Sequence, residues 1–256
     1  LEDAVNIVNE VEYGLTSGLH SLDSNEISYW SNHIHAGNLY VNRGTTGAIV
    51  RRQPFGGWKK SAVGPGAKAG GPNYLIGFGT WSVVEPQAIE GEAIPDIGLL
   101  PEVVELKASL DYGEDFDFCA AGIQSDEQAW RTHFAPKDVS ALKYEKNIFR
   151  YLPALAPVII RVEPNGSWRE LARVLAAAIR AGSKTLISVY TEPPAELVKF
   201  IKSLTQLIVE DDEAWGTRVI AMESGRIRLI GASPEHLKSQ IYANPALAVW
   251  SGEVTT

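Results

Sequence analysis

The residues best suited to chemistry lie in a loop rich in glycine and proline that runs from Val41 to Tyr74. Backbone N–H groups in glycine-rich turns can form a nest that binds an anion. Thr46-Gly47-Ala48 is small enough to let a substrate carboxylate reach the backbone, and Phe55 could pack on the aliphatic part of such a substrate. The alternative is a tight connection whose glycines only supply positive φ angles, and from spacing alone this structural reading is the commoner case.

The other reactive side chains stand apart from one another. Cys119 is the single cysteine, cannot form an internal disulfide, and is interpreted as a core or surface residue. His33 and His35 come without a set of companion ligands, which favours a partner-facing surface over a metal site. The acidic run 210–213 is typical of a solvated helix start. We assign no catalytic residue, no cofactor-binding residue and no metal ligand.

Length and charge narrow the classes of protein. With 256 residues the chain can hold one large or two modest domains. A net charge of −8 argues against a nucleic-acid binder, which needs a basic surface. No apolar run reaches the ~18 residues of a membrane span. A single cysteine is typical of a cytoplasmic protein.

The residues before the loop predict an α/β arrangement of helices and strands. Apolar residues at helical spacing predict a helix at the start of the chain, with Glu2 and Asp3 in its first turn. A short strand over 15–21, a helix over 26–33 and a buried strand over 38–42 follow, and the loop begins where that strand ends. We therefore expect residues 1–86 to form one α/β unit that ends with a strand over 79–84.

The second half reads as a separate layered domain. Residues 87–123 lack a clean period at first and are interpreted as a linker or arm, with a domain boundary between 86 and 102. Residues 124–256 are expected to form a Rossmann-like βαβ domain. Its expected helices cover 124–134, 168–181 (with a Ser167–Glu170 capping box) and 193–204, and its expected strands cover 157–162, 185–190, 207–209, 226–231 and 246–250.

Three ordered motifs in the first part resemble aldehyde dehydrogenases. Gln53-Pro54-Phe55-Gly56-Gly57-Trp58-Lys59-Lys60-Ser61 is similar to the Pro-Phe-Gly-Gly-x-Lys-x-Ser signature near the C-terminal end of that superfamily. Segments 13–18 and 37–42 resemble its Tyr-Gly-Leu and Gly-x-x-x-Val-Asn segments. The stretches 46–57 and 68–74 resemble, more narrowly, the L-glutamate γ-semialdehyde (Δ1-pyrroline-5-carboxylate) dehydrogenases.

This resemblance implies roles for three residues. The backbone amides of Gly47 and Ala48 would hold the α-carboxylate of glutamate semialdehyde, and Phe55 would pack on its carbon chain. The catalytic cysteine, the general base and the NAD+ domain of the family would precede this chain. We therefore expect a fragment that is inactive alone, part of a homo-oligomer through a strand near residues 80–84. Ala62, Trp58 and the pair 51–52 depart from the family pattern, which bears on substrate fit.

The second part resembles another known domain. Residues 144–153 are similar to a Gly-Glu-x-Asn-x-x-Arg-Tyr-x-Pro segment in the C-terminal domain of bifunctional proline-utilisation enzymes, with Tyr144 in place of the glycine. The resemblance implies a non-catalytic, aldehyde-dehydrogenase-like domain that covers the substrate tunnel, and FAD if a proline dehydrogenase is fused upstream. No Gly-x-Gly-x-x-Gly follows Val162. The alternative is a structural or oligomerisation module with a vestigial nucleotide fold.

Overall fold

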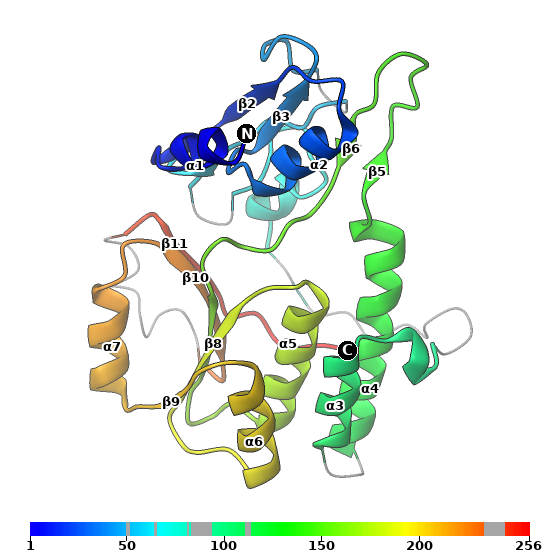
Figure 1. Cartoon of the computed structure of the whole chain (residues 1–256). Helices are drawn as coiled ribbons and strands as arrows, with labels where there is room; N and C mark the ends of the chain where they lie inside the picture. The colour runs from blue at the N-terminus through cyan, green and yellow to red at the C-terminus, as the bar shows by residue number, and fades with distance from the viewer. Residues whose placement is uncertain (50–51, 64–65, 81, 83–93, 111–113, 233–243) are drawn as a thin grey trace. The chain divides into compact units, whose positions relative to one another are not determined.

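The chain divides into two compact units, which are described separately (Figure 1). A computed structural model describes residues 1–49, 52–63, 66–80, 82, 94–110, 114–232 and 244–256. Unit 1 is Leu1–Trp81 with Pro136–Phe149, and unit 2 is Ser82–Ala135 with Arg150–Thr256.

Unit 1 is built from short helices and three two-stranded sheets. Its elements are α1 (Glu2–Asn9), β1 (Tyr13–Gly14), β2 (Thr16–Leu19), α2 (Ser24–His33), β3 (Asn38–Val41), β4 (Trp58–Lys59), the 3-10 helix η1 (Tyr74–Phe78), β5 (Lys137–Asp138) and β6 (Ile148–Phe149). β2 and β3 pair in parallel, whereas β1 with β4 and β5 with β6 pair antiparallel. The two helices and two strands expected before the loop are confirmed.

A small apolar cluster holds the first elements of unit 1 together. Val5 of α1 packs with Trp30 of α2 and with Ile34, and all three are nearly inaccessible to solvent. The Asp23 side chain caps α2 by accepting a hydrogen bond from the Asn25 N–H (2.7 Å). These contacts fix the start of β3, from which the glycine-rich loop departs.

Unit 2 carries a five-stranded parallel sheet in the order β11-β10-β7-β8-β9. Its strands are β7 (Val158–Val162), β8 (Thr185–Val189), β9 (Leu207–Val209), β10 (Gly225–Ile230) and β11 (Leu247–Trp250). Its helices are η2 (Asp96–Gly98), α3 (Pro101–Ala108), α4 (Glu114–Ala129), the π-helical turn η3 (Trp130–Phe134), α5 (Trp168–Arg180), α6 (Ala195–Leu204) and α7 (Asp212–Ile220). The first strand lies in the middle of this order, as in a Rossmann-like sheet, so the expected α/β class is confirmed.

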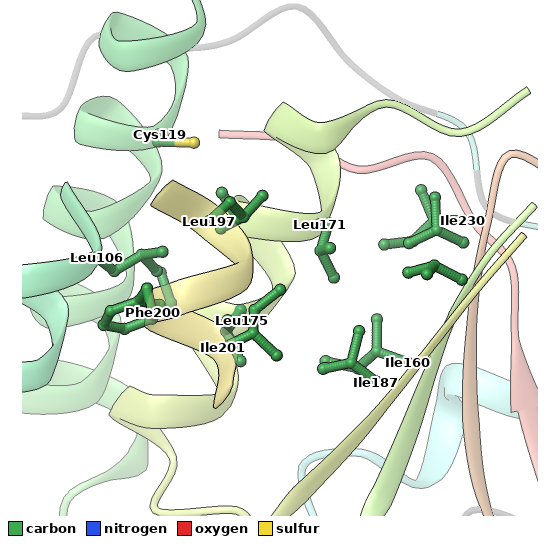
Figure 2. Close-up of a cluster of buried hydrophobic side chains, with 14 of the residues drawn as sticks. Leu106, Cys119, Ile160, Leu171, Leu175, Ile187, Leu197, Phe200, Ile201 and Ile230 are labelled. Atoms are coloured by element: carbon green, nitrogen blue, oxygen red, sulfur yellow. The ribbon is translucent and has the colours of Figure 1, made fainter. Parts of the chain in front are cut away.

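Both faces of this sheet are covered, which explains its apolar strands. Ile160 and Ile187 face the side on which Leu171 and Leu175 of α5 pack (Figure 2). Alternate strand residues form a second cluster around Trp215 of α7. The Ser167–Glu170 capping box predicted from the sequence starts α5.

The interpretation of residues 87–123 as a linker or arm needs correction. α3 and most of α4 lie in that stretch, and Val103, Leu106 and Cys119 pack into the cluster that lines one face of the sheet (Figure 2). Pro101 occupies the start of α3, where a missing N–H costs nothing. Apolar burial therefore makes these helices part of the unit 2 core. Of the strand expected over 79–84, only Gly79, Thr80 and Ser82 are among the described residues, and the rest lies outside them.

Residues 136–149 group with unit 1, although the sequence placed them inside the 124–256 domain. The reason is a set of polar contacts to the glycine-rich loop. The Arg43 guanidinium pairs with the Glu145 carboxylate (3.3 Å), and the side-chain amides of Gln53 and Asn147 lie 3.3 Å apart. These contacts span about a hundred residues of chain, and local patterns do not report them.

A buried ion network stiffens the carboxyl end of the unit 2 sheet. Arg161 is fully buried and donates to Ser188 Oγ (3.1 Å), to the Glu210 carbonyl (3.0 Å) and to the Glu163 carboxylate (3.1 Å). The Glu210 carboxylate accepts from Ser188 (2.7 Å) and from the Arg218 guanidinium (3.1 Å). Buried charges are tolerated when they are paired and hydrogen-bonded in this way.

Replacing Arg161 by methionine should strongly destabilise unit 2. The substitution keeps a long side chain but leaves the buried Glu163 carboxylate without its cation, at a cost of about 3–5 kcal/mol. Urea unfolding followed by circular dichroism measures this loss. Lys199→Met, at an exposed position on α6, is the control and should shift stability by less than about 0.5 kcal/mol. If Arg161→Met lowers the free energy of unfolding by less than about 1 kcal/mol, this network does not make the proposed contribution to the stability of unit 2.

Candidate functional site

The Pro-Phe-Gly-Gly turn is held by the first residue of β3. Asn38 is almost fully buried, its Nδ2 donates to the Pro54 carbonyl (3.0 Å), and its Oδ1 accepts from the Gly56 N–H (3.1 Å). One amide side chain thus satisfies a backbone acceptor and a backbone donor of the turn. Because Asn38 lies in β3, its two hydrogen bonds fix the position of the turn relative to that strand.

A lysine later in the loop closes the same turn from the other side. Lys68 Nζ donates to the carbonyls of Gly37 (2.6 Å) and Gly56 (2.6 Å) and lies 3.2 Å from Asn38 Oδ1. Burial lowers the pKa of Lys68 to about 8. The protonated amine is the form that has three N–H donors for these three oxygens.

Several glycines of the signature are required by close packing. A Cβ at Gly37 would collide with the Gly56 carbonyl, and one at Gly57 would collide with Ser61. The Ser61 hydroxyl in turn accepts from the Gly14 N–H (3.1 Å). These glycines are structural, but they are required by close packing and not by the positive φ angles that the sequence suggested.

Gly47 and Ala48 lie in an open part of the loop. Both are exposed, Gly47 has φ +82°, and nothing in the described chain lies within 4 Å of the position a Cβ would take there. Within the described residues the N–H groups of Gly47 and Ala48 have no hydrogen-bond acceptor. The left-handed backbone is what requires glycine at position 47, and two adjacent free amides are suited to an anion.

Phe55 is half-buried and its backbone is fixed. Its N–H donates to the Ala69 carbonyl (3.0 Å) and its carbonyl accepts from the Ala69 N–H (2.9 Å), which forms an isolated antiparallel bridge. The bridge to Ala69 therefore fixes the backbone of Phe55.

Sequence reasoning missed the residues that support the loop. Asn38 and Lys68 stood inside motifs that were recognised, but the motifs carry no sign of their mutual contacts. Glu145 is about a hundred residues away from Arg43 in the sequence, and no local signal points to their pairing.

The isolated reactive side chains are structural in the described chain. Cys119 is 1% exposed, its thiol donates to the Arg169 carbonyl (3.5 Å), and burial raises its pKa to about 11. Of the two alternatives for this residue, core or surface, the structure shows a core residue. His33 stacks on Tyr29 with ring centroids 4.2 Å apart. Asp211 caps α7 by accepting from the Ala214 N–H (2.9 Å), so the acidic run does begin a helix.

The turn after β7 does not fit the pyrophosphate of a dinucleotide. Gly166 and Gly231 pack so closely that a Cβ at Gly231 would collide with the Gly166 backbone. The Ser167 N–H donates to the Glu170 carboxylate (2.9 Å), and the Glu170 N–H donates to the Ser167 hydroxyl (3.3 Å). The amides that would bind phosphate at this turn are thus occupied.

Comparison with known proteins agrees with the motif order. The aldehyde dehydrogenase family model matches residues 1–83. This part of the chain is therefore similar to the aldehyde dehydrogenase family. Its Pro-Phe-Gly-Gly turn, supported by Asn38 and Lys68, lies within the matched residues.

Relatives and a solved structure extend the similarity. The chain is 49% identical over 75 residues to a 1-pyrroline-5-carboxylate dehydrogenase of Geobacillus kaustophilus, which covers 29% of this chain and 14% of the relative. It is 48% identical over 87 residues to the bifunctional protein PutA of Rhizobium meliloti, covering 34% of this chain and 7% of that protein. The structure of Proline Utilization A (PutA) from Corynebacterium freiburgense matches 99% of this chain and 22% of its own, with a TM-score of 0.69 and 34% identity. The chain thus spans about a seventh or less of the curated relatives it matches.

No helix in the described part of the chain is long and apolar enough to cross a bilayer. Over the same residues, no group of three or more histidine, cysteine, aspartate or glutamate side chains is arranged to hold a metal ion.

Replacing Lys68 by methionine should loosen the signature turn of the aldehyde dehydrogenase segment. Three acceptor oxygens lose their common donor, which costs about 1–3 kcal/mol near pH 7. The folded-state pKa of about 8 lies below the ordinary lysine value of 10.5, so the folded chain binds fewer protons than the unfolded chain between these two pH values. Wild-type stability should therefore gain relative to Lys68→Met as the pH rises from about 8 to about 10.5. Unfolding midpoints across this range measure the gap, and a constant gap would contradict the burial of the ammonium.

Proposed function

We propose that this chain supplies the carboxylate-binding loop of an NAD+-dependent dehydrogenase that oxidises L-glutamate γ-semialdehyde to L-glutamate in proline catabolism. The single observation that carries the proposal is the pair of exposed amides at Gly47 and Ala48, which have no acceptor among the described residues and lie on a left-handed backbone. A substrate with an α-carboxylate supplies the acceptor that these amides need. Identity near 50% to a 1-pyrroline-5-carboxylate dehydrogenase in this region supports the substrate class.

In this proposal, the groups that react with the aldehyde end of the substrate lie outside this chain. Cys119 is buried, has a raised pKa, and is the single cysteine, so it cannot act as the thiolate nucleophile. NAD+ binds elsewhere in the full protein, since the turn after β7 is closed. FAD belongs to a proline dehydrogenase domain if one is fused upstream, as the similarity to PutA suggests.

Unit 2 is proposed to be a non-catalytic cover domain. Its sheet keeps the Rossmann-like order, but its strand-end turn is filled by Glu163 and by the contact between Gly166 and Gly231. The full protein is proposed to act in the cytoplasm as a homo-oligomer, with a small-molecule substrate and no nucleic acid, and the acidic charge supports the last point.

Phe55→Ala in the full enzyme should weaken substrate use selectively. Packing of a phenyl ring on the substrate chain is worth about 1.5–3 kcal/mol, so kcat/KM for glutamate semialdehyde should fall about 10- to 100-fold while the KM for NAD+ stays unchanged. The backbone bridge to Ala69 does not use the ring and should persist. Steady-state kinetics with glutamate semialdehyde and with propanal, which lacks the carboxylate, provide the measurement.

The controls separate packing from general damage. Leu22→Ala changes an apolar side chain in unit 1 that is 98% exposed and should leave all constants unaltered. The 256-residue chain alone serves as the blank and should show no turnover. Unchanged kinetics for glutamate semialdehyde in Phe55→Ala would contradict the packing role of the ring. Turnover by the 256-residue chain alone would contradict the proposal that the nucleophile lies outside it.

A further inference from the structure

The ion pair between Arg43 and Glu145 connects the candidate carboxylate site to a segment far along the chain. Arg43 Nη1 lies 3.3 Å from Glu145 Oε2, and each side chain is 34% exposed. The Arg43 guanidinium also lies over the ring of the buried Tyr40, 5.5 Å from its centroid. Stacking and pairing together hold the guanidinium in one place at the end of β3.

The Gln53 side chain links the Arg43 guanidinium to the backbone of the glycine-rich loop. When the Gln53 amide is turned so that its oxygen accepts from Arg43 Nη1 (2.8 Å), its nitrogen donates to the Gly47 carbonyl (3.2 Å). Glu145, Arg43, Gln53 and Gly47 thus form one continuous chain of polar contacts. Every member of this chain belongs to unit 1.

The Gly47 carbonyl and the Ala48 N–H belong to the same peptide plane. A trans peptide bond points these two groups in opposite directions, and rotation about the bond costs far more than thermal energy. When Gln53 fixes the Gly47 carbonyl, it also fixes the direction of the Ala48 N–H. The amide is then aimed away from Gln53, toward the open side of the loop.

The segment that supplies Glu145 is itself ordered by short-range contacts. The Asp138 carboxylate accepts from the N–H (3.0 Å) and the hydroxyl (2.7 Å) of Ser140, and Asn147 Nδ2 donates to the same hydroxyl (2.9 Å). Those contacts lower the pKa of Asp138 and keep it charged. Glu145 therefore lies in a segment between β5 and β6 whose conformation is held by these hydrogen bonds.

We propose that Glu145, Arg43 and Gln53 are positioning residues that orient the Gly47–Ala48 peptide toward the carboxylate of the substrate. This inference rests on the proposed function and extends it, because residues from the 136–149 segment then set the specificity of the aldehyde dehydrogenase segment. A carboxylate held by a pre-oriented amide binds more tightly than one that must order the loop itself.

The test uses the full enzyme and three variants. Gln53→Met removes the donor to Gly47 without adding charge, and should raise the KM for glutamate semialdehyde about 10-fold, the worth of roughly one hydrogen bond. Glu145→Gln leaves Gln53 in place and should raise that KM about 3-fold, as suits a half-exposed ion pair. In the double variant the Glu145→Gln substitution should add nothing, because Glu145 acts through Gln53.

Two readouts distinguish positioning from simple loss of structure. The kcat for glutamate semialdehyde, the KM for NAD+ and all constants for propanal should stay within about 2-fold of wild type, since only carboxylate binding is affected. Asp96→Asn removes an ion pair with Lys107 in unit 2, outside the glycine-rich loop, and should change nothing. Equal losses on both aldehydes in the two single variants would overturn the proposal, as would a Glu145→Gln effect that persists in the Gln53→Met background.

The outcomes also separate this inference from the proposed function. If the wild-type enzyme does not prefer glutamate semialdehyde over propanal, the carboxylate-binding function itself fails, and the positioning role fails with it. If wild type shows the preference and Phe55→Ala loses it while Gln53→Met and Glu145→Gln retain it, the positioning role alone fails.

Discussion

An ammonium group enclosed by backbone oxygens holds the glycine-rich loop of unit 1 in place. Lys68 reaches the carbonyls of Gly37 and Gly56, and Asn38 completes the same turn from β3. A buried polar backbone is costly unless every donor and acceptor has a partner, and these two side chains meet that need where no sheet does. The position of every residue in the Pro-Phe-Gly-Gly turn, Phe55 included, depends on them.

The loop therefore has two parts, one whose polar groups bond within the protein and one whose backbone is exposed. From Pro54 to Ser61 its polar groups are used internally and its glycines permit close packing. Around Gly47 the backbone is exposed, left-handed and free of internal acceptors in the described chain. A rigid support next to an unsatisfied pair of amides is what a binding site for an anion requires, because the cost of ordering the loop is met before the ligand arrives.

Much of this arrangement could be predicted from the sequence. Helical periodicity and capping residues predicted α2 and α5, and apolar runs predicted β3 and the parallel strands. Motif order indicated the similarity to aldehyde dehydrogenases, and this resemblance, rather than the spacing of the glycines, assigned a carboxylate to Gly47 and Ala48, which stays a prediction. The helix expected over 124–134 corresponds to the end of α4 and to η3, whereas α3 and the first part of α4 were missed because their stretch lacks a clean apolar period, with acidic residues in the first turn of α4. Their burial comes from packing against α5 and the sheet rather than from local pattern. The support by Lys68 and Glu145 was missed for the same physical reason, since a contact between distant residues leaves no trace in the spacing of either.

The most direct test of the central claim is a crystal structure of the full enzyme with the product L-glutamate bound. The account predicts a carboxylate oxygen within about 3.2 Å of the backbone nitrogens of Gly47 and Ala48. It also predicts that the aliphatic chain of the product lies on the Phe55 ring. A glutamate whose carboxylate is held by side chains elsewhere, with both amides more than about 4 Å away, would contradict it.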